Sequence, residues 1–187
     1  MPSLLPLKGL KALDAETAKA LAAFKGLGLD LSGLTAIDAA TAKILAGFKG
    51  EELCLRGLKT LDETTATALA TFQGDDANPR AGVLCLDGLK AIDAPTAAAL
   101  ARFKAAQRFR NGELQLNGLT TLDAGSAKAL AAFKGRTLEL KGLTTLDADA
   151  TSAIERFEMI VELDVSRLGD EIPLTEELAR VLAAQKY

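Results

Sequence analysis

One pattern of apolar and polar positions recurs along the chain, most often every 24 residues. The copy that begins at Leu29 reads Leu-Asp-Leu-Ser-Gly-Leu, so apolar and polar residues alternate. An alternation with a period of two predicts a short β-strand that is buried on one face and solvated on the other. We therefore expect Leu29 and Leu31 on the buried face, and Asp30 and Ser32 on the solvated face.

A helix is expected after each strand. In the same copy, Asp38 precedes a run of good helix formers over residues 39–49, and Gly50 follows. An aspartate side chain can accept a hydrogen bond from the free N–H groups of a first helical turn, and glycine readily takes the left-handed conformation that ends a helix. The pattern predicts a helix of about three turns.

Each expected helix has one apolar side. In the second copy, Ala42, Leu45 and Phe48 recur at three-residue steps and would face the strands. Apolar residues at helical spacing usually belong to a core, which favours a phenylalanine spine over an aromatic ligand box. Six of the seven phenylalanines occupy this repeat position: Phe24, Phe48, Phe72, Phe103, Phe133 and, more loosely, Phe157.

The copies define a repeat protein. A strand and a short helix cannot bury their own apolar faces, so neighbouring copies must stack, with their strands parallel. We expect a single α/β domain over residues 1–187. Its clear repeats begin at Leu5, Leu29, Leu53, Leu84, Leu114 and Leu138, and a degraded seventh begins near Leu163.

The spacing Leu29-x-Leu31-x-x-Leu34-x-x-Ile37 and its counterparts resemble the leucine-rich-repeat family, in an atypical, bacterial-type form of about 24 residues. The resemblance covers residues 5–168. It implies a right-handed, curved solenoid with a parallel β-sheet on the concave side and short α-helices on the convex side. The family's usual asparagine after the strand is replaced by Leu34 and its equivalents, so no asparagine ladder is expected at this turn.

The two ends of the repeat array differ. Residues 174–183 form an amphipathic pattern that Thr175 can cap, which predicts a C-terminal capping helix over residues 175–185. No comparable module precedes the first repeat. Pro6 lies in the first expected strand, where its missing N–H would weaken pairing with another sheet edge.

Two insertions interrupt the 24-residue spacing. Leu53 and Leu84 are 31 positions apart, and Leu84 and Leu114 are 30 positions apart. Both insertions fall between a helix and the next strand, so the two loops should project from the same rim, where insertions often carry function. The insertions either have no function, with their aspartates pairing with their arginines, or bind a partner. The candidate residues are Asp75, Asp76, Arg80, Arg108, Phe109 and Arg110.

The outward strand residues are a second candidate surface. Arg56 and Asp87, with Cys54 and Cys85, would form its centre. Typical binding anchors are aromatic residues and arginine, and no aromatic residue occurs at these positions, so a plain solvated face is favoured. The two cysteines lie on adjacent expected strands; free surface thiols are favoured, with a disulfide as the alternative.

An aspartate precedes each expected helix, and together these residues would form a row along one edge. Such a row could bind divalent cations. Helix capping is the favoured explanation, because the N-terminus of a helix stabilises a negative charge. The row consists of Asp14, Asp38, Asp62, Asp93, Asp123 and Asp147.

Composition narrows the function classes. The chain has 22 basic and 25 acidic residues, a net charge of −3, and no long basic run, so neither nucleic-acid binding nor membrane insertion is expected. It contains no histidine to activate a nucleophile, and no phosphate-binding glycine loop or Cys/His metal motif. We expect no enzymatic activity, no cofactor and no metal.

The sequence favours a non-catalytic scaffold that binds another protein through its rim loops and the concave face. The alternative is a structural or self-associating module of a longer repeat array or cell-surface protein, with self-association through the N-terminal repeat. A small-ligand or carbohydrate binder is a third class, and it is disfavoured because exposed aromatic residues are scarce. The sequence does not distinguish a cytoplasmic protein from one that is exported with a leader not present in this chain.

Overall fold

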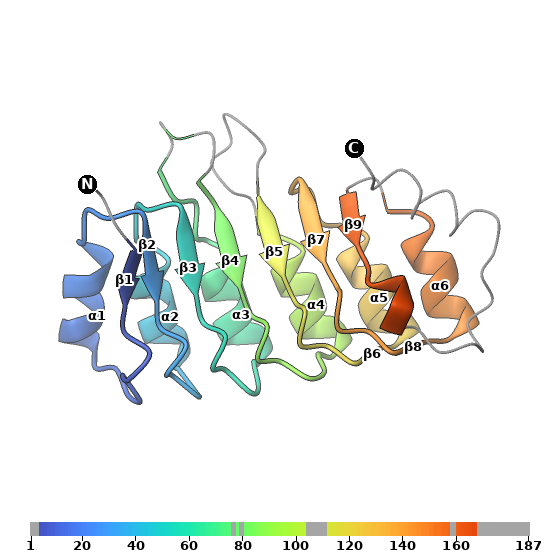
Figure 1. Ribbon diagram of the computed structural model, residues 1–187, viewed down its shortest axis with the longest axis horizontal. Helices are drawn as coiled ribbons and strands as arrows, with labels where there is room; N and C mark the ends of the chain where they lie inside the picture. The colour runs from blue at the N-terminus through green and yellow to red at the C-terminus, as the bar shows by residue number, and fades with distance from the viewer. Residues whose placement is uncertain (1–3, 76–77, 79–80, 104–111, 158–159, 168–187) are drawn as a thin grey trace.

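The computed structural model describes residues 4–75, 78, 81–103, 112–157 and 160–167 (Figure 1). Seven short strands form one parallel sheet, in the order β1-β2-β3-β4-β5-β7-β9. Their bounds are β1 Leu4–Pro6, β2 Gly28–Asp30, β3 Glu52–Cys54, β4 Val83–Cys85, β5 Glu113–Gln115, β7 Thr137–Glu139 and β9 Ile160–Glu162. Each strand therefore pairs with the strand of the preceding and of the following repeat.

A helix follows each of the first six strands of this sheet in the chain. The helices are α1 Ala15–Ala22, α2 Ala39–Leu45, α3 Glu63–Leu69, α4 Ala94–Leu100, α5 Ala124–Leu130 and α6 Ala148–Ile154. They lie side by side along one face of the sheet, which gives two layers (Figure 1). A two-stranded parallel sheet of β6 (Thr121–Leu122) and β8 (Thr145–Leu146) and the 3₁₀ turn η1 (Val165–Arg167) complete the described elements.

This architecture confirms the predicted α/β class, parallel sheet and short helices. The first leucine of each clear repeat occupies the same register position, as in the pairing of Leu5 with Leu29 and of Leu29 with Leu53. The seventh strand joins the sheet through Val161, which pairs with Leu138. Leu163, near which the sequence pattern indicated the seventh repeat, therefore lies at the position of the second leucine.

The core lies between the two layers. Leucines from the buried face of each strand contact alanine, leucine and phenylalanine from the helices and the turns after them. The phenylalanine spine is confirmed over five repeats, from Phe24 to Phe133, with neighbouring ring centroids 6.3–6.5 Å apart and ring planes within 13° of parallel. Phe48, Phe72 and Phe103 are fully buried. Stacked rings at this spacing fix the distance between repeats.

The helices are shorter than predicted. The second one ends at Leu45 rather than near Lys49. Gly47 N–H then donates to the carbonyl of Ile44, and Phe48 N–H donates to that of Leu45. This tighter i to i−3 bonding closes the last turn early, and the side chain of Phe48 lies in the core.

The expectation that Gly50 ends the helix in a left-handed conformation is wrong. Among the described glycines only Gly74 and Gly82 have positive φ angles, of 68° and 103°. At Gly50 the reason is space, because an added Cβ would overlap the ring of Phe48.

A second row of glycines makes close stacking of the repeats possible. An added Cβ at Gly57 would overlap the carbonyl oxygens of Ser32 and Leu34 in the preceding repeat. The equivalent glycines at positions 33, 88, 118 and 142 meet carbonyl oxygens in the same way. Gly9, which has no repeat before it, has nothing within 4 Å of its added Cβ. The repeated Gly-Leu pair is therefore a packing requirement between neighbouring turns.

The aspartate caps are confirmed. Each accepts a hydrogen bond from a backbone N–H of the first helical turn, at 2.6–2.9 Å. In the second repeat this bond joins Asp38 Oδ1 to Thr41 N–H, and it is the main cause that lowers the pKa of Asp38. At the equivalent of Thr41 in the fifth repeat, the buried Ser126 hydroxyl also donates to the carbonyl of Ile92 at 3.0 Å. The first helical turn thus links neighbouring repeats.

Several predictions lie outside the described residues. They are the capping helix over residues 175–185 and five of the candidate loop residues, Asp76, Arg80, Arg108, Phe109 and Arg110. None of the described helices is both long and apolar enough to cross a lipid bilayer.

Candidate functional site

The sheet face opposite the helices carries a row of polar side chains, and we call it the open face. The last residue of each strand points to it, because side chains alternate along a strand and the preceding leucine is in the core. In strand order these residues are Pro6, Asp30, Cys54, Cys85, Gln115, Glu139 and Glu162.

The expectation of a plain solvated face is wrong at four of these positions. Asp30, Cys54, Cys85 and Glu139 are 3%, 1%, 0% and 8% exposed. Neighbouring strands of a sheet lie only about 4.8 Å apart, so long side chains on adjacent strands cover the shorter ones between them. Lys8, for example, extends to within 3.5 Å of Asp30.

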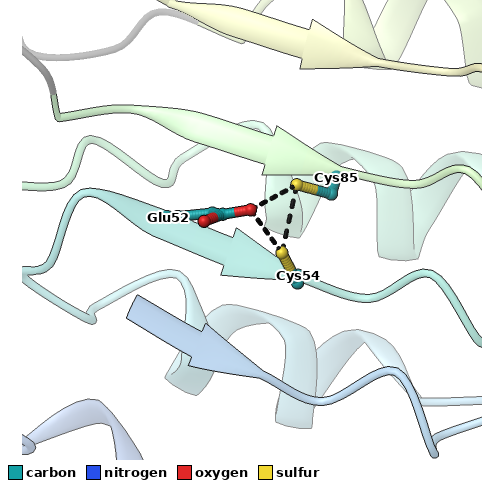
Figure 2. A group of neighbouring side chains, drawn as sticks. All are labelled: Glu52, Cys54 and Cys85. Atoms are coloured by element: carbon teal, nitrogen blue, oxygen red, sulfur yellow. Dashed lines mark hydrogen bonds between the residues drawn. The ribbon is translucent and has the colours of Figure 1, made fainter. Parts of the chain in front are cut away.

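A thiol-carboxylate cluster of Glu52, Cys54 and Cys85 lies at the centre of the open face (Figure 2). The two cysteines are register partners on β3 and β4, and Glu52 lies two residues before Cys54 on the same face. Both thiols donate to Glu52 Oε1, from Cys54 Sγ at 2.7 Å and from Cys85 Sγ at 3.1 Å. The two sulfur atoms are 3.2 Å apart.

The prediction of free thiols is confirmed, but the prediction that they lie at the surface is wrong. The sulfur separation is well beyond the bond length of about 2.05 Å in a disulfide. The hydrogen bond with Cys54, burial and the negative charge of Glu52 all raise the pKa of Cys85. The protonated thiol is thus the favoured form in this environment.

Arg56 lies over the cluster. Its Nη2 is 3.4 Å from both Cys85 Sγ and Glu52 Oε1, and its Nε donates to Asp87 Oδ2 at 3.0 Å. Partial burial lowers the pKa of Arg56, but the neighbouring Cys85, Cys54 and Asp87 outweigh it, so the pKa is raised overall. The structure therefore brings together the Arg56, Asp87 and cysteine patch that the sequence indicated.

The hydrogen-bond network of the open face continues towards β9 through three glutamates, Glu113, Glu139 and Glu162. Gln115 Nε2 donates to Glu113 Oε1 at 2.6 Å and to Glu139 Oε1 at 3.3 Å. Burial is the main cause that raises the pKa of Glu113. Burial also acts to raise the pKa of Glu139, but hydrogen bonds from Asn117 and Lys141 outweigh it and lower that pKa. Lys141 bridges this group to β9, through a 2.5 Å contact with Glu162.

A short ladder of side-chain bonds runs along the edge of the open face. Asp87 Oδ1 accepts from Asn117 N–H at 2.9 Å, and Asn117 Oδ1 accepts from Lys141 N–H at 3.0 Å. This ladder was not predicted from the sequence, because the expectation for this turn rested only on the position of Leu34 and its equivalents. The available signal was an acceptor side chain just before the repeat glycine in two consecutive repeats.

Of the candidate loop residues, only Asp75 is described. It lines, with Lys25, Lys49, Glu51 and Asn78, a depression of about 380 Å³ at one end of the strands. Asn78 Nδ2 donates to Glu51 Oε1 at 2.6 Å, which ties the first insertion to the residue before β3. Neither Asn78 nor Glu51 was predicted from the sequence, since neither belongs to a repeated position.

Within the described residues, one group of at least three side chains of the metal-binding types converges, and it is the thiol-carboxylate cluster. Its available signal was a cysteine at the same repeat position on two adjacent strands, with an acidic residue two positions before the first. Comparisons of the chain with family models, with curated proteins and with solved structures found no match.

Proposed function

We propose that this protein is a leucine-rich-repeat-like, non-catalytic scaffold that binds another protein through the open face and the adjoining rim loops. One observation carries the proposal: in the described part of the chain, six helices cover one face of the seven-stranded sheet, and the open face presents polar and charged side chains joined by hydrogen bonds and ion pairs. A row that is already ordered lowers the entropic cost of binding.

A right-handed, curved solenoid is the shape we propose for the repeat array. Connections from one strand over a helix to the next parallel strand are right-handed in almost all known cases. Packed helices need about 8–10 Å between their axes, whereas paired strands need about 4.8 Å. A helix layer that is wider per repeat than the sheet layer bends the array, with the sheet on its concave side.

The chemistry of the open face favours a partner of mixed charge. Acidic side chains dominate between β5 and β9, while Arg56, whose side chain is 42% exposed, lies near the centre. Arginine is enriched among the residues that contribute most to binding energy. We infer that Arg56 and Asp87 contact the partner, and that Asp75 and the insertions extend this surface at the rim.

Affinity capture from the source organism tests this function with three variants. Arg56→Glu changes the open face, a variant shortened to the 24-residue spacing removes the insertions, and Lys43→Glu on the exposed side of α2 is the control. We expect one reproducible partner that the control retains and that Arg56→Glu loses. Equal capture by all variants, or no partner for any, would contradict the proposal; loss on shortening alone would place binding on the loops.

The alternative, a self-associating module, is supported by a different observation. Leu4 and Ile160, on the two edge strands β1 and β9 of the described sheet, are 45% and 41% exposed, so both edge strands carry an exposed apolar side chain beside unpaired backbone groups. Self-association at an edge predicts a mass that rises with concentration in sedimentation and that Leu4→Lys returns to the monomer. A monomer at all concentrations would exclude this function.

A further inference from the structure

We propose that Glu52, Cys54 and Cys85 form a binding site for one thiophilic metal ion of the Zn²⁺ class, with two sulfur ligands and one oxygen ligand. The proposal goes beyond the scaffold function and does not depend on it. It is carried by the convergence of three ligand atoms, one from each residue, that all lie within 4.8 Å of one another (Figure 2).

The distances suit a small cation after a minor expansion. With Zn–S bonds of about 2.3 Å and a Zn–O bond of about 2.0 Å, a tetrahedral site requires about 3.8 Å between sulfur atoms and about 3.5 Å between sulfur and oxygen. The observed separations are 3.2 Å between the sulfur atoms, and 2.7 Å and 3.1 Å from sulfur to Glu52 Oε1. Changes of less than about 1 Å are within reach of side-chain rotation alone.

The backbone holds the ligands in place. Cys54 and Cys85 are register partners in the middle of a seven-stranded sheet, so neither strand can slide without breaking its pairing on both sides. Glu52 shares the strand of Cys54. A site built on strands rather than on loops is held at a fixed geometry, which favours metal binding.

A divalent ion offsets most of the charge of the cluster. Binding of the ion displaces the two thiol protons to water, and the resulting two thiolates and one carboxylate carry three negative charges. A divalent ion therefore leaves the site with one negative charge. The guanidinium of Arg56, with Nη2 at 3.4 Å from Cys85 Sγ and from Glu52 Oε1, offsets part of that charge, which it shares with the carboxylate of Asp87. Arg56 is held there by Asp87 and Gln115. A buried ionic site requires such a compensating charge.

The ligand set selects the class of metal. Thiolates favour Zn²⁺, Cd²⁺ and Cu⁺ over Mg²⁺ and Ca²⁺, which prefer six or more oxygen ligands. Both cysteines are buried, whereas the side chain of Glu52 is 32% exposed, so an ion would enter past Glu52. Water would fill the fourth position of a tetrahedral site.

A cadmium titration of the reduced full chain tests the site, because the charge-transfer absorption of Cd–thiolate bonds lies in the ultraviolet. The chain has only two cysteines, so this absorption reports on them alone. We expect one ion per chain and displacement by Zn²⁺ but not by Mg²⁺. Cys54→Ser and Cys85→Ser should each weaken binding at least about 100-fold, and Glu52→Gln at least about tenfold. Removing a group that only supports a metal ligand already weakens binding by about 10–100-fold, so removing a ligand itself should cost no less.

Glu113→Gln is the matched control. Glu113 occupies the same register position as Glu52 two strands away, and Gln115 stands beside it in place of a cysteine. The control should leave the Cd²⁺ affinity unchanged, and circular dichroism should show that both glutamine variants fold. Absence of the absorption band, one ion per two chains, equal effects of the two glutamine variants, or a Glu52→Gln variant with the original affinity would each overturn the site.

Discussion

Phe72 and Phe103 stack with their ring planes 1° from parallel and their centroids 6.3 Å apart, although 31 positions separate them in the chain. Phe48 and Phe72, which are separated by 24 positions, stack in nearly the same way, at 6.5 Å and 4°. The additional residues of the first insertion therefore leave the spacing between repeats unchanged.

The spine predicts an unequal cost of removing its rings. Phe103 is fully buried between two stacked neighbours, whereas Phe24 is half-buried and stacks on Phe48 alone. We expect Phe103→Ala to reduce the free energy of unfolding by about 3–5 kcal/mol, and Phe24→Ala to reduce it by clearly less. Urea denaturation followed by circular dichroism measures both. Equal losses would show that the spine does not stack as described.

The glycine row gives a second stability prediction with its own control. Gly57→Ala places a methyl group against the carbonyl oxygens of Ser32 and Leu34, so the repeats must separate locally. We expect a loss of about 1–3 kcal/mol or more in the free energy of unfolding.

Gly9→Ala is the control for this prediction, because it meets no atom within 4 Å. It should be neutral, or stabilise by about 0.4–1 kcal/mol through the unfolded chain. The same denaturation curves compare the two variants, and a destabilising Gly9→Ala would mean that glycine is needed for the turn itself.

Much of the fold could be predicted because each repeat contains its own local signals. Asp38 caps its helix by accepting a hydrogen bond from Thr41 N–H, three residues later, and the strand is indicated by the alternation of Leu29 with Asp30. Both the cap and the strand therefore depend on residues that are close in sequence. Repetition then fixed the pairing of neighbouring strands. The seventh strand was misplaced by two residues because Val161 is not a leucine and gave no signal at the first position.

The candidate site was harder to predict, because burial on the open face depends on contacts between repeats. Cys85 is buried by Arg56 and Glu52, which lie 29 and 33 positions earlier in the chain. Arg56 also reaches Gln115, 59 positions away. No periodicity within one repeat reveals how far such a long side chain extends across its neighbours.

The helix caps predict how stability changes with pH. Hydrogen bonds from backbone N–H groups are the main cause that lowers the pKa values of Asp14, Asp38 and Asp123 in the folded chain. For Asp62 and Asp93, hydrogen bonds with the side chains of Thr64 and Thr96 are the main cause, and backbone N–H groups add to it. A folded pKa below the unfolded value of about 3.9 adds stability at higher pH, and this stability is lost as pH falls through the folded pKa values. We therefore expect the urea midpoint to fall steeply below about pH 4.

A variant with three caps replaced separates this effect from that of other carboxylates. Asn caps a helix about as well as Asp but does not titrate, so Asp38→Asn, Asp62→Asn and Asp93→Asn together should preserve the fold at pH 7. The decrease of the urea midpoint between pH 5 and pH 2 should be shallower than in the original chain. An unchanged pH dependence would mean that the acid sensitivity lies elsewhere, for example at Glu139.

The burial of Cys54 and Cys85 predicts slow reaction with thiol reagents. Their exposed fractions are 1% and 0%, so a reagent must wait until the groups that cover the sulfur atoms move aside. We expect both thiols to react at least about a hundredfold more slowly in the native chain than in denaturant, which corresponds to an opening free energy of roughly 3 kcal/mol. A colorimetric thiol assay in the presence of a metal chelator measures the two rates.

The same assay tests which side chain covers the sulfur atoms. Arg56 Nη2 lies 3.4 Å from Cys85 Sγ, so Arg56→Ala should uncover this thiol and raise the native rate of reaction. Lys141→Ala, on the same face but bound to Glu139 and Glu162, should leave that rate unchanged. Equal effects of the two variants would show that Arg56 does not cover the cluster. A native rate equal to that of a free cysteine would show that the thiols are not buried as described.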